Sequence, residues 1–194
     1  MRILWCCALE LIRSFIAVDV EKPEIADKIV RIQRDLESVG ADLKLVEPEN
    51  FHFTLQFLGN ITPAMVDLVY KAMTEVKAKP FTMTLKGLGA FPVVGNPRVV
   101  WIGVSRGGEY LIDIYKQLEP KLRKLGFQPD KEFTPHLTIA RVKSGRAKGA
   151  LAHKIMELSN IEIGEIEVNC IRLKKSTLTP RGPIYETLRE VTFK

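Results

Sequence analysis

The sequence predicts an α+β fold in which antiparallel strands and helices form two related lobes. Strand-like runs alternate with amphipathic helical runs along the chain, and some of the strands form hairpin pairs, which a doubly wound parallel sheet would not contain. A strand, helix, strand pattern in the first half also recurs in the second half. The chain has 194 residues, 46% of them apolar, and is long enough to bury a core without a metal or a disulfide.

The first half is expected to contain two strand and helix units. Residues 13–20 alternate and are rich in β-branched side chains, which is typical of a strand. Pro23 opens an amphipathic helix that Gly40 can cap. A second strand region covers residues 43–59, and Thr62 with Pro63 begins a helix that runs to about Lys79.

The second half is expected to repeat this order with more hairpins. Residues 81–88 and 98–104 are predicted as strands joined by the Gly- and Pro-rich segment GAFPVVGNP. The remaining expected elements are a helix after Gly107 and Gly108, a strand at 133–142, a helix near 147–158, and two closing strands, EIEVNCIRLKKS and IYETLREVTFK, on either side of TLTPRGP.

Charge and cysteine content favour a cytoplasmic protein with a polyanionic partner. Nearly all of the net charge of +6 lies in the last third of the chain, which favours RNA, although a basic surface can also serve only solubility. The three cysteines form no CxxC pair, which fits a reducing compartment. Glu10 and Arg13 interrupt the apolar start, so residues 1–12 are interpreted as an extension and not as a signal peptide. No run reaches the roughly 18 apolar residues of a membrane span.

The chemical signal is a motif that occurs twice. His-x-Thr-x appears as HFTL at residues 52–55 and as HLTI at residues 136–139, at matching places in the repeat. Residues two apart in a strand share a face, so each histidine neighbours its threonine while the apolar residues face the core. One such motif alone would more often be a structural polar pair. If two lobes pack about a pseudo-twofold axis, His52, Thr54, His136 and Thr138 face one cleft.

Two opposed histidines suit displacement at phosphorus by acid and base catalysis. A neutral imidazole would take a proton from the attacking water, and a protonated one would give a proton to the departing ribose oxygen. Thr54 and Thr138, aided by Arg141, would hold the non-bridging oxygens. No metal or cofactor is expected; the alternative is a metal site with Glu49 or Glu132 as a third ligand. The P-loop, dinucleotide and zinc-protease motifs are absent.

These residues resemble the two-histidine phosphoesterases, specifically the RNA 2′,3′-cyclic phosphodiesterases, also called LigT-like or 2′-5′ RNA ligase proteins. The resemblance covers residues 13–194 and is carried by five segments in the family's order: RSFIAVDV, FHFTLQFLGNI, PRVVWIGV, FTPHLTIAR and IRLKKSTLTPRGPIYETL. It implies a single bilobal domain, each lobe an antiparallel sheet with helices outside, and a cleft between the lobes that holds both motifs. Residues 1–12 have no counterpart.

The resemblance also implies the reaction. RNA ends with a 2′,3′-cyclic phosphate would be hydrolysed to 2′-phosphates, with His52 as proton donor and His136 as proton acceptor; the residues alone do not distinguish these roles. Family members are associated with joining tRNA halves through a 2′-5′ linkage, which is the reverse chemistry. The expected partners are RNA termini, without a membrane, and the chain is expected to be a monomer. A noncatalytic RNA-end-binding module and a phosphodiesterase for 2′-5′ oligonucleotides or a small cyclic nucleotide are the alternatives.

Several further residues are weaker candidates for substrate contact. Arg98 begins the expected strand at 98–104. Ser176, Arg181 and Tyr185 lie in or beside a terminal turn that could border the cleft, and a role in the turn and hairpin is the alternative for them. The aromatic residues Phe51, Phe91 and Trp101 could stack on a base, but burial in the core is the simpler expectation for them. The third histidine, His153, is expected on a helix surface.

Overall fold

The computed structural model describes residues 11–129, 133–180 and 182–194. Strands and helices alternate along them as the sequence predicts, and each pairing between strands is antiparallel. The elements are β1 (Ile12–Asp19), α1 (Pro23–Ser38), β2 (Leu43–Leu45), the 3-10 helix η1 (Pro48–Asn50), β3 (His52–Ile61), α2 (Pro63–Thr74), β4 (Phe81–Val93), β5 (Asn96–Arg106), α3 (Gly108–Lys124), β6 (Leu137–Val142), α4 (Lys148–Glu157), β7 (Glu162–Val168), β8 (Cys170–Leu178) and β9 (Pro183–Thr192).

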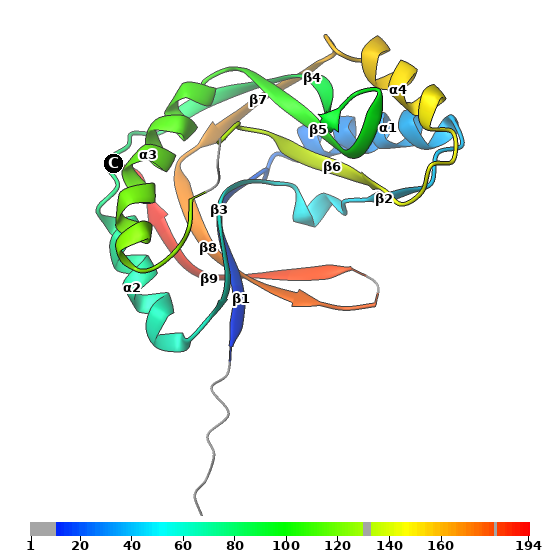
Figure 1. Cartoon of the computed structure of the whole chain (residues 1–194). Helices are drawn as coiled ribbons and strands as arrows, with labels where there is room; N and C mark the ends of the chain where they lie inside the picture. Colours follow the sequence, from blue (N-terminus) through cyan, green and yellow to red (C-terminus); the bar gives the residue numbers. More distant parts are fainter. Residues whose placement is uncertain (1–10, 130–132, 181) are drawn as a thin grey trace, which may run out of the picture.

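The strands form one curled nine-stranded sheet with helices on its outside (Figure 1). Its order is β7-β4-β5-β6-β3-β1-β8-β9, with β2 paired to β6. We call β1, β3, β8 and β9 the first lobe, and β2, β4, β5, β6 and β7 the second lobe. The lobes meet where β3 pairs with β6, and the chain also passes between them at Asn169, where β7 ends and β8 begins. The predicted fold class, antiparallel α+β with two pseudo-symmetric lobes, is confirmed.

The helices α1 and α3 come from different halves of the chain and cover different lobes. α1, from the first half, packs with α4 over the second lobe and contacts β7, whereas α3, from the second half, packs with α2 and contacts β3 of the first lobe. The buried faces of these helices supply much of the core, for example Ile29 of α1 and Leu111 of α3. The repeat in the sequence therefore builds each lobe from both halves of the chain.

The segment GAFPVVGNP was wrongly predicted to be a connector. β4 continues to Val93, β5 begins at Asn96, and only residues 94–95 form the turn. Gly89 lies opposite Trp101 in this hairpin, and a Cβ there would lie 2.3 Å from ring carbons of the indole, so this glycine provides packing space and not a turn. β7 pairs only with residues 81–86 of β4, which leaves Pro92 on an edge where its missing N–H costs nothing.

Other boundaries differ modestly from the expectations. α2 ends at Thr74 and not at about Lys79, β6 begins at Leu137 and not at residue 133, and the predicted strand EIEVNCIRLKKS is interrupted at Asn169. β1 begins at Ile12, which pairs with Ile61, and the extension expected at residues 1–12 lies mostly outside the described residues. Within the described part of the chain, no helix has the length and apolar character needed to cross a bilayer.

Candidate active site

The register between β3 and β6 brings the two motifs together. Phe53 pairs directly with Leu137, and both side chains are buried in the core. In an antiparallel pair the residues on either side of this central pair point to the opposite face. His52 then lies diagonally across from His136, with Thr54 and Thr138 beside them, in a set of four polar side chains related by an approximate twofold axis through the Phe53–Leu137 pair.

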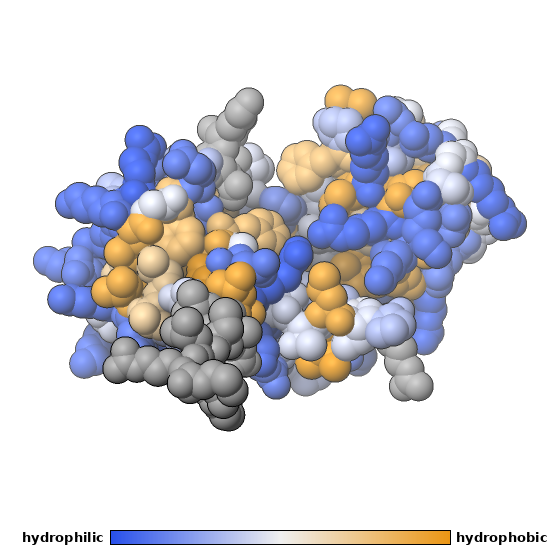
Figure 2. All heavy atoms as spheres, turned by 60° about the horizontal axis from the view of Figure 1, so that its bottom comes forward, coloured by the Kyte–Doolittle hydropathy of each residue, from blue (hydrophilic) through white to orange (hydrophobic). Residues whose placement is uncertain are grey.

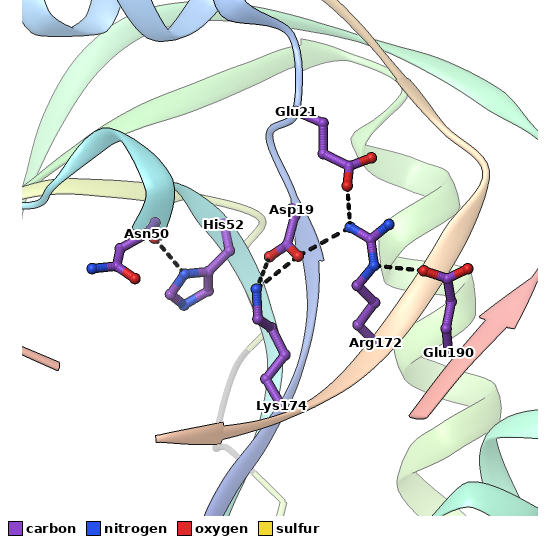
Figure 3. Close-up of polar contacts among 7 residues, drawn as sticks. All are labelled: Asp19, Glu21, Asn50, His52, Arg172, Lys174 and Glu190. Carbon is purple, nitrogen blue, oxygen red and sulfur yellow. Dashed lines mark hydrogen bonds and ion pairs between the residues drawn. The ribbon is translucent and has the colours of Figure 1, made fainter. Parts of the chain in front are cut away.

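Each histidine makes the same kind of hydrogen bond, from Nδ1 to the backbone carbonyl two residues earlier. His52 Nδ1 lies 2.7 Å from the carbonyl oxygen of Asn50, and His136 Nδ1 lies 2.7 Å from that of Thr134 (Figure 3 shows the first of these). A carbonyl can only accept a hydrogen bond, so Nδ1 carries the proton in each ring and Nε2 is the atom that can exchange a proton with substrate. The side chain of Asn50 in turn donates to the carbonyl oxygen of Pro183, at 3.2 Å, which ties η1 to β9.

Aromatic rings surround each imidazole. The ring of His52 lies 4.9 Å from that of Phe15 and 5.3 Å, edge to face, from that of Tyr185. The ring of His136 lies 4.9 Å, edge to face, from Phe91, with Trp101 at 6.4 Å. These packed rings restrict the orientation of both imidazoles, which is the precision that proton transfer requires.

The electrostatic setting of His52 favours the neutral ring. The pKa of His52 is lowered to about 4, mainly by burial; the positive charges of Lys174 and Arg141 contribute to the lowering, and the Asn50 carbonyl and Asp19 oppose it. The same Arg141 opposes the rise in the pKa of Tyr185 that burial causes. The charge of Arg141 on β6 therefore acts on two groups of the first lobe, His52 and Tyr185.

Arg141 lies on the same face of the sheet as the motif residues because β6 contains a bulge. Strict alternation would put it on the face opposite Thr138, three residues away. Trp101 pairs with Thr138 and Val100 with Ala140, so one residue of β6 is unmatched and Val99 pairs with Arg141. Val99 and Trp101 share a face of β5, and Arg141 therefore shares the face of Thr138. The sequence named this residue as a candidate without supplying the reason.

The matching irregularity in β3 turns Phe57 to the face of the sheet that carries the two histidines. Ala17 pairs with Thr54, Ile16 with Gln56, and Phe15 with Phe57, so Phe57 shares the face of Phe15, and their rings lie 6.1 Å apart. Phe57 is 57% exposed and is equivalent in the repeat to Arg141. Figure 2, in which the bottom of Figure 1 comes forward, shows apolar areas among hydrophilic side chains on that face of the molecule. Phe57 was not predicted as a site residue.

The motif threonines lie on the same face of the sheet as the two histidines. Thr54 faces the small Ala17 and Thr138 faces Trp101 across their strand pairs, and both threonines are half-buried. Within the described ranges, neither hydroxyl makes a hydrogen bond to another group of the protein. Both hydroxyls can therefore donate to an incoming oxyanion.

The weaker candidates lie at different distances from the two motifs along the sheet. Tyr185 contacts His52, and Ser176 is buried directly opposite Tyr185 on β8. Arg98 is exposed on β5, at the point where the register between β4 and β5 shifts. Arg181 and Glu132 lie outside the described residues.

His153 and Phe51 lie where the sequence predicted them. His153 is exposed on α4, and Phe51 is buried in the core. Among residues 11–129, 133–180 and 182–194, no group of three or more histidine, cysteine, aspartate or glutamate side chains is arranged to hold a metal, and Glu49 is exposed on η1.

Sequence reasoning missed the charged residues behind His52. Asp19 pairs with His52 across β1 and β3, and Lys174 of β8 binds Asp19 (Figure 3). The signal available in the sequence was Asp19, a charged residue at the end of the mostly apolar strand β1. A separate cavity of about 1300 Å³ opens between α2, α3 and the ends of β4 and β9, and residues of neither motif line it.

The fold and the doubled site together define a two-histidine phosphoesterase. The model of the family described as "LigT like Phosphoesterase" matches the chain twice, at residues 18–101 and 102–185, with one His-x-Thr-x motif in each match. The chain belongs to this family, and the resemblance seen in the sequence is confirmed.

Relatives and solved structures agree with this membership. The RNA 2′,3′-cyclic phosphodiesterase of Archaeoglobus fulgidus is 45% identical over 177 residues, covering 91% of this chain and 98% of that protein. That of Aquifex aeolicus is 42% identical over 188 residues, covering 94% and 97%. The crystal structure of E. coli LigT complexed with 3′-AMP has a TM-score of 0.77 over 95% of this chain and 99% of that one; at 23% identity it shows likeness of fold.

Proposed function

We propose that this protein hydrolyses the 2′,3′-cyclic phosphate ends of RNA to 2′-phosphates. The observation that carries the proposal is the opposition of two identically held imidazoles across the Phe53–Leu137 pair. Relatives at 38–45% identity over most of the chain bear the name RNA 2′,3′-cyclic phosphodiesterase, which supports the substrate.

In the proposed reaction the two Nε2 atoms act on opposite sides of the phosphorus. His136 accepts a proton from water as the water oxygen bonds to phosphorus, and His52 gives a proton to the 3′ oxygen as the bond from phosphorus to that oxygen breaks. The phosphate remains on the 2′ oxygen. The direction of these roles follows the family resemblance.

The donor role requires that His52 gain a proton when substrate binds. The free protein holds this imidazole neutral, because its pKa is about 4. A phosphodiester anion beside the ring favours the protonated form and offsets the cationic influence of Arg141 and Lys174. His52 thus gains its proton when the substrate binds, and it can act as a proton donor only when the phosphate is present.

The remaining cleft groups bind and orient the RNA end. Thr54, Thr138 and Arg141 would donate hydrogen bonds to the non-bridging oxygens, where negative charge increases in the transition state. The exposed ring of Phe57 offers a stacking surface for the terminal base. Tyr185 and Ser176 would border the ribose.

Further parts of the proposal concern setting and scope. We expect hydrolysis to need no metal, and we expect a cytoplasmic monomer. The same acid and base, acting in reverse, would join tRNA halves through a 2′-5′ linkage. Size-exclusion chromatography with light scattering tests the monomer, and incubation with 2′,3′-cyclic-phosphate and 5′-hydroxyl tRNA halves tests ligation.

The decisive experiment is turnover of an oligonucleotide that ends in a 2′,3′-cyclic phosphate. The protein should act at full rate in EDTA, and His52→Ala and His136→Ala should each lower kcat by roughly 100- to 10,000-fold without loss of folding. His153→Ala, at an exposed histidine, is the control. Binding without turnover, unchanged in the histidine variants, would identify an RNA-end-binding module; inhibition by EDTA would identify a metal enzyme; faster turnover of 2′-5′ oligonucleotides would change the substrate.

A further inference from the structure

Five charged side chains form an ion-pair cluster next to His52, which we call the charge cluster: Asp19, Glu21, Arg172, Lys174 and Glu190 (Figure 3). Lys174 Nζ lies 2.6 Å and 2.7 Å from the two carboxylate oxygens of Asp19. Arg172 also contacts Asp19, at 3.0 Å, and binds Glu21 and Glu190 at the edge of the cluster. Asp19 is thus shared by two cations.

The inner pair of this cluster is buried. The side chain of Lys174 is 7% exposed and that of Asp19 is 15% exposed, whereas Glu21 and Glu190 are exposed to solvent. Removing both charges of a pair from water costs free energy that their mutual attraction often fails to recover, so a buried ion pair is weak evidence for a role in stability. A role in setting the local electrostatics explains its position better.

The strand register places the inner pair beside the imidazole. Asp19 lies directly opposite His52 in the pairing of β1 with β3, so both side chains are on the cleft face. Lys174 lies opposite Phe15 in the pairing of β1 with β8, and the Phe15 ring packs on His52. The described groups that act on His52 are thus Asp19 from β1, Lys174 from β8, Arg141 from β6 and the Asn50 carbonyl, with Tyr185 from β9 packed on the ring.

We propose that Lys174 and Asp19 are positioning residues with opposed effects, which adjust the protonation equilibrium of the buried His52 before substrate binds. The Lys174 ammonium disfavours a second positive charge on the imidazole, and the Asp19 carboxylate favours it while fixing the ammonium in place. His136 lacks an equivalent pair among the ion pairs of the described residues, so this pair acts on only one of the two motifs. The inference rests on the proposed function for the catalytic role of His52, but its test is made without substrate and does not depend on turnover.

The test is the titration of His52 by NMR in the protein without substrate. Long-range ¹H–¹⁵N spectra of the histidine side chains follow each ring, and the spectrum of His52→Asn assigns the signals. In Lys174→Met the midpoint of His52 should rise by about one pH unit or more, because a nearby like charge is removed. In Asp19→Asn the midpoint should fall, so that His52 stays neutral to the lowest pH at which the protein remains folded.

Opposite shifts distinguish this role from a structural one. Loss of packing or of local order would move both variants in the same direction, toward the ordinary value of an exposed histidine. Lys175→Met is the matched control, since it removes the next lysine of β8, whose ion pair with Glu186 is on the surface, and it should leave the midpoint in place. Lys174→Gln, which can still hydrogen-bond to Asp19, replaces Lys174→Met if that variant fails to fold.

The outcomes separate this inference from the proposed function. Shifts in the same direction, or a midpoint unmoved by either substitution, would overturn the inference even if the protein turns over cyclic phosphate. Opposite shifts would support it even if no turnover were found. With turnover in hand, the limb of the kcat/KM profile that belongs to His52 should move upward in Lys174→Met by the same amount, because kcat/KM reports the free protein.

Discussion

The burial of His52 leads to a prediction about folding that needs no substrate. The pKa of this imidazole is about 4 in the folded protein, with burial as the main cause, against about 6.5 in an unfolded chain. Between these pH values the unfolded chain binds a proton at this position that the folded protein does not. The free energy of unfolding is therefore unaffected above about pH 6.5 and decreases as the pH falls toward 4.

The size of the effect follows from the shift. A difference of about 2.5 pH units at about 1.4 kcal/mol per unit gives about 3.5 kcal/mol, which is fully developed below about pH 4. Between pH 7 and pH 5 the same difference destabilises the protein by about 2 kcal/mol. This is a large part of the free energy of unfolding of a typical domain, which is roughly 5–15 kcal/mol.

Urea unfolding at pH 7 and pH 5 measures this contribution. His52→Asn keeps an N–H that can donate to the Asn50 carbonyl but cannot titrate, so its loss of stability between the two pH values should be about 2 kcal/mol smaller than that of the unmodified protein. The carboxylates titrate in both proteins and cancel in the comparison. His153→Asn controls for removing one imidazole. Equal losses in the unmodified protein and in His52→Asn would refute the burial argument.

Three further predictions test other parts of the site. Arg141→Met should lower kcat/KM by about 100-fold, with only partial recovery in Arg141→Lys, because a planar, charge-assisted donor to the phosphate is lost; an unchanged steady-state rate would exclude Arg141 from the site. Gly89→Ala should cost about 1–3 kcal/mol in urea unfolding because its Cβ meets the Trp101 ring, whereas Gly95→Ala, which meets nothing within 4 Å, is the control; equal stability of the two variants would contradict this packing. Phe57→Ala should raise KM for an oligonucleotide by roughly 10-fold while leaving kcat unchanged, since stacking on a base is lost; a drop confined to kcat would argue against stacking.

The sequence was sufficient for the architecture and for the four motif residues. Strand alternation puts His52 and Thr54 on one face and Phe53 on the other, and this pattern depends only on local geometry. Because the motif recurs at HLTI, the opposition of the two histidines could also be predicted before their register was known.

The rest depends on contacts that no local pattern encodes. Lys174 and Asp19 are 155 residues apart along the chain, and their pairing follows from the register of β1 with β8. The bulges that turn Arg141 and Phe57 toward the cleft add one residue to one strand and appear only when the partner strand is known. Gly89, the first residue of GAFPVVGNP, was predicted to belong to a connector because its packing partner, the Trp101 ring, comes from the next strand.

The central claim is that paired histidines open a cyclic phosphate with water and leave the phosphate on the 2′ oxygen. Its most direct test is ³¹P NMR and mass spectrometry of the product formed from a 2′,3′-cyclic-phosphate oligonucleotide in H₂¹⁸O. We predict a 2′-phosphate that carries one ¹⁸O atom, formed by the unmodified protein and by His153→Ala but not by His52→Ala or His136→Ala. A 3′-phosphate product, or the same 2′-phosphate formed at an undiminished rate by both histidine variants, would contradict the account.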